Sequence, residues 1–215
     1  MSETTRSPFG RLLQAAACGA LGLALCGATP FGSTYDKAPA PRPEPRRPAR
    51  VPAPPERSQR LPSGWYNPMP GGVMMGYPAD TGLDIAGFHL PVYALGAGRI
   101  VYSESGHTLW SGPRDDDNAV LLELDTAVAH QGRMITHVWY AHLSELKLVH
   151  PYGTPGPRVE AGERLGTSGI ANHCPHLHIG LLLDGHIRQR YEWLLRDAEI
   201  RSLLGYRLGQ RLPLR

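Results

Sequence analysis

Two histidines separated by one residue, His176 and His178, are the first residues whose types and spacing suggest chemistry. On an extended strand, residues i and i+2 point to the same face about 6.6 Å apart, and Leu177 points the other way. Two neighbouring imidazoles can supply one metal ligand and one acid or base for proton transfer. A buried, hydrogen-bonded pair of histidines has the same spacing, so the motif alone leaves both interpretations open.

Three further segments combine metal-binding or proton-transfer residues with strand or turn context. They are the aspartate-containing Asp80–Ala86, the histidine-containing Tyr140–Ser144 and the glycine-rich turn Gly166–Gly169. Carboxylates and imidazoles are ligands that zinc accepts, and imidazoles also move protons. These segments can form one site only if the fold brings them together.

The elements expected to position these residues are short β-strands separated by Gly, Pro, Asn and Asp, which indicates a mainly antiparallel β-fold. Helical spacing occurs only near the end of the chain, where Tyr191, Leu194, Leu195 and Ala198 follow the i, i+3, i+4, i+7 pattern. This pattern predicts a C-terminal helix that caps the sheet. The predicted strands are Leu83–Ala86, Val92–Ala94, Arg99–Tyr102, Val120–Leu124, Thr136–Ala141, Leu165–Thr167 and His176–Leu182.

The positive charge of the chain lies in its first part. Residues 1–62 hold 9 Lys/Arg and 4 Asp/Glu, whereas residues 63–215 hold 13 and 15, although the whole chain carries a formal charge of +3. A nucleic-acid-binding domain is expected to concentrate basic residues on its folded part. The distribution therefore argues against a nucleic-acid partner.

The first 28 residues resemble a secretory signal. Arg6 and Arg11 precede the apolar stretch Leu12–Ala28, which ends in small residues. This stretch of seventeen residues, rich in Gly and Ala and interrupted by Gln14, is marginal for a membrane span, which needs about 20. An uncleaved anchor and a lipid on Cys26 or Cys18 remain alternatives. We expect an exported protein of the periplasm or cell envelope that meets the membrane only through this segment.

Residues 29–63 are predicted to form a linker and residues 64–215 the folded domain. From Asp36 to Pro62, nine of 27 residues are proline and six are arginine. Proline-rich stretches favour extended polyproline II structure and resist collapse. We expect a cationic, semi-rigid tether.

The order of the motifs resembles that of the lysostaphin/LytM-type zinc peptidoglycan endopeptidases. An aspartate-bearing strand is followed by Pro91–Ala94 and Gly98–Tyr102, then Tyr140–Ser144, the glycine-rich turn and His-Leu-His. The resemblance runs from Gly71 to Leu183. It implies a LytM-type antiparallel β-sheet or sandwich core, zinc as the cofactor and peptidoglycan as the partner.

The resemblance also implies roles for individual residues. Asp84 matches the family's aspartate ligand, and His178, the second histidine of His-x-His, matches a histidine ligand. His176 and His142 match the catalytic pair. In such sites this pair orients the attacking water and stabilises charge during amide hydrolysis.

Asp80 departs from the family pattern, because the first ligand histidine should stand four residues before Asp84. In one hypothesis Asp80 itself binds the metal, giving an Asp/Asp/His set. The added negative charge then makes a bound water a weaker acid and shifts the preference from zinc towards Mn²⁺ or Fe²⁺. In the other hypothesis the metal is lost, and the domain binds peptidoglycan or activates a partner hydrolase. Hydrolysis of another envelope peptide is a third, weaker alternative.

Two other features have competing interpretations. On an extended strand, Cys174 shares a face with His176 and His178, so its thiolate is a further potential ligand unless Pro175 breaks the alternation. A small buried cysteine is the simpler interpretation. The acidic run Asp115–Asn118 lacks the spacing of a calcium loop, and we interpret it as a solvated turn.

Overall fold

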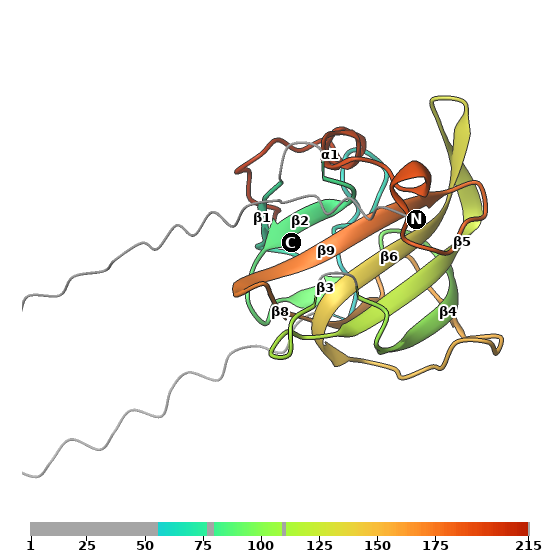
Figure 1. Ribbon diagram of the computed structural model, residues 1–215. Helices are drawn as coiled ribbons and strands as arrows, with labels where there is room; N and C mark the ends of the chain where they lie inside the picture. The colour runs from blue at the N-terminus through green and yellow to red at the C-terminus, as the bar shows by residue number, and fades with distance from the viewer. Residues whose placement is uncertain (1–55, 77–79, 109–110, 215) are drawn as a thin grey trace, which may run out of the picture. The chain divides into compact units, whose positions relative to one another are not determined.

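The computed structural model describes residues 56–76, 80–108 and 111–214. The predicted signal segment and most of the predicted linker lie outside these residues. The described chain folds around one 9-stranded sheet, with a short helix near its C-terminus (Figure 1). The strands are β1 (Val73–Met74), β2 (Leu83–Ala86), β3 (Pro91–Tyr93), β4 (Gly98–Ser105), β5 (Asn118–His130), β6 (Arg133–Leu146), β7 (Arg158–Val159), β8 (Arg164–Ala171) and β9 (Cys174–Leu183).

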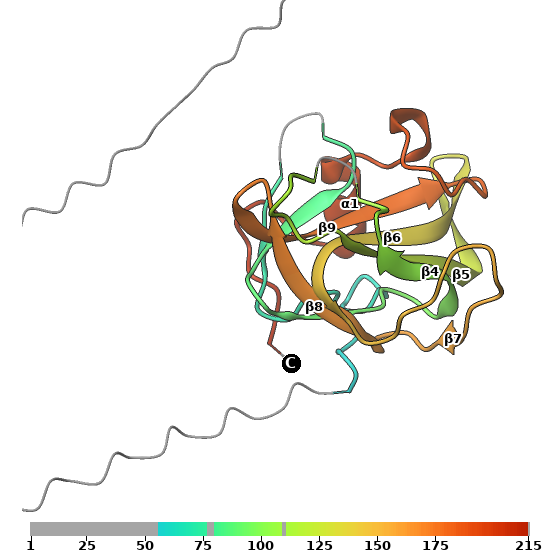
Figure 2. The same cartoon turned by 60° about the horizontal axis from the view of Figure 1, so that its bottom comes forward.

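All strand pairs of the sheet are antiparallel. The strand order is β1-β2-β9-β8-β6-β5-β4-β7, and the ninth strand, β3, pairs with β8 off this path. The first part of β6 pairs with β9, from Ile135 to Ala141, and its last part pairs with β8, from Leu143 onward. Figure 2 shows β6 curving so that this last part runs alongside β8. The predicted fold class, mainly antiparallel β with a C-terminal helix, is confirmed.

The strands bury apolar side chains on both faces of the sheet. Alternation along each strand separates the larger cluster, which includes Ile85, Val138 and Leu177, from a smaller one around Tyr102, Leu121 and Trp139. The candidate site lies on the face of the smaller cluster, because Trp139 belongs to both that cluster and the site pocket.

The packed structure includes residues before position 64. Arg57 forms a β-bridge with Glu163, and the Ser58 amide donates to the Gly162 carbonyl over 2.8 Å. Leu61 is 3% exposed and belongs to the core. The end of the predicted linker is therefore part of the folded unit. The apolar surface that Leu61 buries in the core favours this arrangement.

The C-terminal helix begins later than the sequence predicted. The helix α1 spans Asp197–Leu204, and a short 3₁₀ turn, η1 (Tyr191–Trp193), precedes it. Between them the chain is extended, because Leu194 bridges Leu182 and the Leu195 amide donates to the Leu181 carbonyl. Backbone pairing with β9 therefore determines the conformation of Leu194 and Leu195, despite their helical spacing in the sequence. Ile200 and Leu204 of α1 are buried in the core as a capping helix requires.

The predicted strands are all present, although β5 and β6 are much longer than expected. The glycine-rich Gly166–Gly169 lies inside β8, so its prediction as a turn was wrong. Gly166 is needed there because the Glu145 carbonyl oxygen would lie 2.2 Å from a Cβ at this position. Among the described residues, no helix is long and apolar enough to cross a membrane.

Candidate active site

Sheet register places Asp84 directly opposite His178. The two residues are cross-strand partners in the antiparallel pair of β2 and β9. Side chains of such partners lie on the same face of the sheet. The Asp84 carboxylate Oδ1 accordingly lies 2.8 Å from Nδ1 of His178, within hydrogen-bonding distance. Two residues 94 positions apart in sequence thus meet through strand pairing alone.

His176 lies on the same face, two residues before His178 in β9. Its Nδ1 lies 2.8 Å from the Cys174 carbonyl oxygen, to which it can only donate, and its Nε2 lies 3.8 Å from Oδ1 of Asp84. The ring is therefore held from behind, with Nε2 facing Asp84. Both histidines are mostly shielded from solvent, with side chains 8% and 13% exposed for His176 and His178.

His142 joins this pair from the neighbouring strand β6. Ala141 is opposite Ala119 of β5, but Leu143 is opposite Asn118, so His142 is the additional residue of a β-bulge. Its φ of 61° lies in the left-handed region, which is unusual for a histidine. The bulge marks the point where β6 changes partner from β9 to β8. Such bulges redirect a side chain relative to its neighbours in the strand.

The ring of His142 lies 5.0 Å from that of His176 and 6.2 Å from that of His178, measured between centroids. Burial lowers the pKa of His142 to about 4, and the nearby His176 and His178 act in the same direction. The backbone of Asp116 and the carboxylate of Asp84 oppose this shift only in part. The imidazole of His142 is therefore neutral at pH 7 and available as a proton acceptor.

Asp84 remains ionised beside these rings. Burial alone would raise the pKa of Asp84, but hydrogen bonding to His178 and favourable electrostatic interactions with the three histidine rings lower it overall. A buried carboxylate that keeps its charge needs such partners. The site therefore presents one anionic oxygen facing two imidazole nitrogens.

Gly82 fixes the position of the His178 ring. It has a φ of +90°, and a Cβ there would lie 2.2 Å from Nε2 of His178. Only glycine accommodates both this conformation and the close contact. Because Nε2 faces the backbone of Gly82, Nδ1 is the nitrogen that faces Asp84.

Asp80 lies at the margin of the site, before β2 begins. Its Oδ1 accepts the Thr81 amide over 2.8 Å, and its carbonyl oxygen accepts the Asp197 amide over 3.2 Å. In the described part of the chain, no hydrogen bond or ion pair joins Asp80 to Asp84 or His178. The second carboxylate oxygen of Asp80 is not engaged by any described residue.

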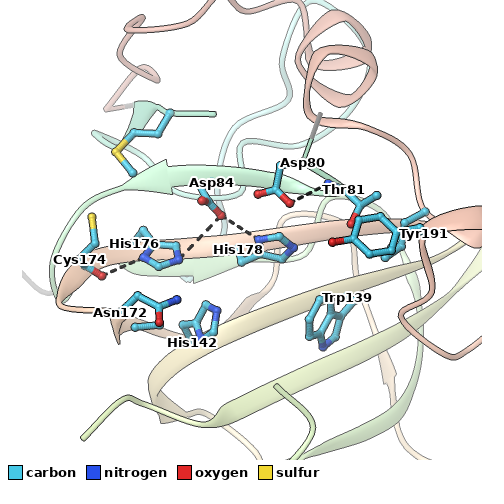
Figure 3. Close-up of a pocket in the computed structure, with 13 residues that line it drawn as sticks. Asp80, Thr81, Asp84, Trp139, His142, Asn172, Cys174, His176, His178 and Tyr191 are labelled. Carbon is cyan, nitrogen blue, oxygen red and sulfur yellow. Dashed lines mark hydrogen bonds and ion pairs between the residues drawn. The ribbon is translucent and has the colours of Figure 1, made fainter. Parts of the chain in front are cut away.

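One pocket contains all five predicted site residues, and Cys174, Trp139 and Tyr191 line it as well (Figure 3). Cys174 begins β9, so Pro175 does not break the alternation. The five predicted site residues in this pocket are Asp80, Asp84, His142, His176 and His178.

The family model described as peptidase family M23 matches residues 79–189, which is just over half of the chain. The chain belongs to peptidase family M23. A search of curated proteins found no match. Among solved structures, the catalytic domain of lysostaphin from Staphylococcus simulans is 21% identical with a TM-score of 0.41, over 60% of this chain and 89% of that chain.

Two further solved structures are similar to this chain. A putative peptidase M23 from Pseudomonas aeruginosa is 19% identical with a TM-score of 0.43, over 72% of this chain and 55% of that chain. A zinc-containing peptidase from Vibrio cholerae is 18% identical with a TM-score of 0.36, over 60% of this chain and 37% of that chain.

Two donor atoms of this M23 site, on Asp84 and His178, are spaced nearly as a divalent metal requires. No group of three His, Cys, Asp or Glu residues converges closely enough to hold a metal in the described chain. Two ligands at tetrahedral angles on zinc lie about 3.3 Å apart. Nδ1 of His178 and Oδ1 of Asp84, now 2.8 Å apart, need to separate only slightly. The unengaged oxygen of Asp80 is a third donor lining the same pocket.

Asp115 and Asp116 have a structural role that the sequence pattern did not indicate. Oδ2 of Asp116 accepts the Ile170 amide, and Oδ2 of Asp115 accepts the Asn172 amide, over 2.8 and 3.0 Å. These bonds hold the β8–β9 hairpin, which carries His176 and His178. The acidic run is thus more than a solvated turn. The sequence signal for this role is the acidic run itself, which favours a turn. Nothing in the sequence identifies the backbone amides that its carboxylates accept.

Proposed function

We propose that this M23 protein is a metallopeptidase that hydrolyses peptide bonds of bacterial peptidoglycan. The observation that carries the proposal is the meeting of Asp84 and His178, through Oδ1 and Nδ1 at 2.8 Å, beside the rings of His142 and His176. Membership in a peptidase family supports amide hydrolysis as the reaction. Peptidoglycan as the substrate rests on the resemblance of the motifs to the lysostaphin/LytM type.

Asp80, Asp84 and His178 are the residues that would hold the metal, which is zinc or, given two carboxylates, Mn²⁺ or Fe²⁺. A metal bound there supplies Lewis acidity, which polarises the scissile carbonyl and makes a bound water more acidic. The burial of Asp84 makes the field of its charge stronger within the site.

His176 and His142 provide the proton transfers. Because Nδ1 of His176 donates to the Cys174 carbonyl, Nε2 is the nitrogen of this ring that can accept a proton in the pocket. His142 is neutral at pH 7, since burial lowers its pKa to about 4. One imidazole can therefore accept the proton of the attacking water and pass it to the leaving amine, and the other can stabilise the developing charge through an N–H hydrogen bond.

A non-catalytic function is the second candidate, and the position of Asp80 favours it. One oxygen of its carboxylate is bonded to Thr81, and the described donors do not form a closed metal site. In this case the pocket binds peptidoglycan, or activates a partner hydrolase, without turnover. Either function places the protein outside the cytoplasm, which we propose from the signal-like first 28 residues.

The test combines metal analysis with digestion of purified peptidoglycan. The full chain, purified without chelator, is assayed for bound Zn, Mn and Fe by mass spectrometry and for release of soluble fragments from labelled peptidoglycan. We expect about one metal per chain and cleavage that chelation abolishes. His178→Ala should lose metal and activity, whereas His142→Ala should keep the metal and lose activity.

Asp80→His separates the two candidates. If the wild type lacks metal and activity but Asp80→His gains both, the non-catalytic function is correct for the natural chain. If neither protein releases fragments although both are folded by circular dichroism, peptidoglycan hydrolysis is excluded.

A further inference from the structure

The C-terminal part of the chain, from Arg190 onward, lies beyond the family match but forms one wall of the site. The match ends at residue 189, whereas Tyr191 and Leu194 both line the pocket. The same part supports the segment before β2, because the Gly82 amide donates to the Leu195 carbonyl and Thr81 bridges Arg196. The pocket of this protein is therefore completed by residues outside the family's common region.

Tyr191 is the most exposed member of this wall. Tyr191 is 66% exposed, although it lines the pocket. Figure 3 shows the ring at the His178 end of the pocket, beside Thr81, and at the opposite end from Cys174. Its hydroxyl makes no hydrogen bond with any described residue. An aromatic ring and an available donor thus face the space where a substrate must lie.

The residues on both sides of Tyr191 are held in place. The Trp193 ring stacks on His186 at 3.8 Å between centroids and packs against the Arg190 guanidinium at 5.1 Å. Arg133 donates to the Glu192 carbonyl over 2.9 Å, and Leu194 pairs with Leu182 of β9. A contact residue on such a fixed support loses little backbone entropy when a ligand binds.

We propose that Tyr191 binds the substrate peptide at the His178 end of the pocket. Its ring packs on the aliphatic part of the peptide, and its hydroxyl donates to a peptide carbonyl or carboxylate oxygen. This role rests on the proposed peptidoglycan hydrolysis and assigns Tyr191 to substrate binding, with the proton transfers left to the histidines. The effect of its removal should therefore be on KM and not on kcat.

The test uses the full chain, dye-labelled peptidoglycan and three variants. We expect Tyr191→Ala to raise the apparent KM about tenfold with kcat within about twofold, because it loses the ring contact and the hydrogen bond. Tyr191→Phe keeps the ring and should raise KM about threefold. Tyr152→Ala is the matched control, since Tyr152 is 54% exposed but does not line this pocket. It should behave as the wild type.

Binding is measured separately by co-sedimentation with unlabelled peptidoglycan in a His142→Ala background. Adding Tyr191→Ala there should weaken binding about tenfold, in agreement with the change in KM. If the wild type cleaves and Tyr191→Ala leaves KM and binding unchanged, or lowers kcat alone, the role of Tyr191 is wrong while the proposed function stands. If the wild type neither binds nor cleaves peptidoglycan, both proposals are overturned.

Discussion

At the scale of single residues, the backbone of His142 is a costly feature that serves the site. A left-handed conformation costs an L-residue about 1–2 kcal/mol because Cβ approaches the following carbonyl. His142 adopts φ 61° at the bulge where β6 changes partner. Without the bulge, alternation would set residue 142 on the face opposite that of Ala141, away from the site. Strain of this kind persists where the surrounding structure determines it.

The bulge predicts an unusual order of stability for two variants. We expect His142→Gly to be more stable than His142→Ala by about 1 kcal/mol, because glycine adopts positive φ without a steric cost. Both variants should lack peptidase activity. Urea denaturation of the chelated proteins measures the difference.

Glu145, in the same strand and without a positive φ, provides the control for the His142 pair. At this position glycine should be less stable than alanine, which is the normal order within a strand. If alanine is also preferred over glycine at position 142, the left-handed conformation is not strained.

At the scale of elements, the site depends on the β8–β9 hairpin. Asn172 and His173, which connect the two strands, have φ of 50° and 62°. Two consecutive positive φ values are typical of the tight turns whose twist matches that of the flanking strands. The adjacent loop reinforces the hairpin, because Asp116 bonds to Ile170 through both its backbone and its side chain.

Removal of the Asp116 carboxylate should loosen this hairpin. We expect Asp116→Ala to lower the free energy of unfolding by about 1 kcal/mol, since the Ile170 amide loses its acceptor. Hydrogen exchange of that amide should become at least several-fold faster. The comparison is Asp117→Ala, because the exposed side chain of Asp117 has no hydrogen-bond partner in the described chain. Equal exchange in the two variants would show that the loop does not hold the hairpin.

Local patterns predict the strands, and the resemblance of the motifs to the lysostaphin/LytM type predicts five residues that line one pocket. His176 and His178 are recognisable because alternation sets both on one face of a strand. Their pairing with Asp84 depends on register between β2 and β9, which no local pattern encodes. The helix was placed too early because Leu194 and Leu195 fit a helical face, but tertiary pairing with β9 determines their conformation.

At the scale of the whole molecule, the pKa values of two histidines buried in the described sheet are lowered. Burial lowers the pKa of His137 in β6, and burial also lowers the pKa of His142 to about 4. A histidine of the unfolded chain titrates near 6.5. The unfolded state therefore binds more protons than the folded state between about pH 6.5 and pH 4.

Stability should consequently fall as the pH decreases through this range. For a depressed pKa the stabilisation is fully present above the unfolded value and is lost as the pH approaches the folded value. We expect the melting temperature of the chelated protein to be constant above about pH 7.5 and to decline steadily below about pH 6.5. The lowered pKa of Asp84 adds a further loss of stability only at more acidic pH, below its ordinary value of 3.8.

Replacing His137 by Gln removes one titrating group, so the decline of the melting temperature between pH 6.5 and pH 5 should become shallower, while the melting temperature stays constant above about pH 7.5. If the melting temperature of His137→Gln falls with pH as steeply as that of the wild type, His137 binds its proton equally well in the folded and unfolded states. Its burial then does not contribute to the loss of stability in acid.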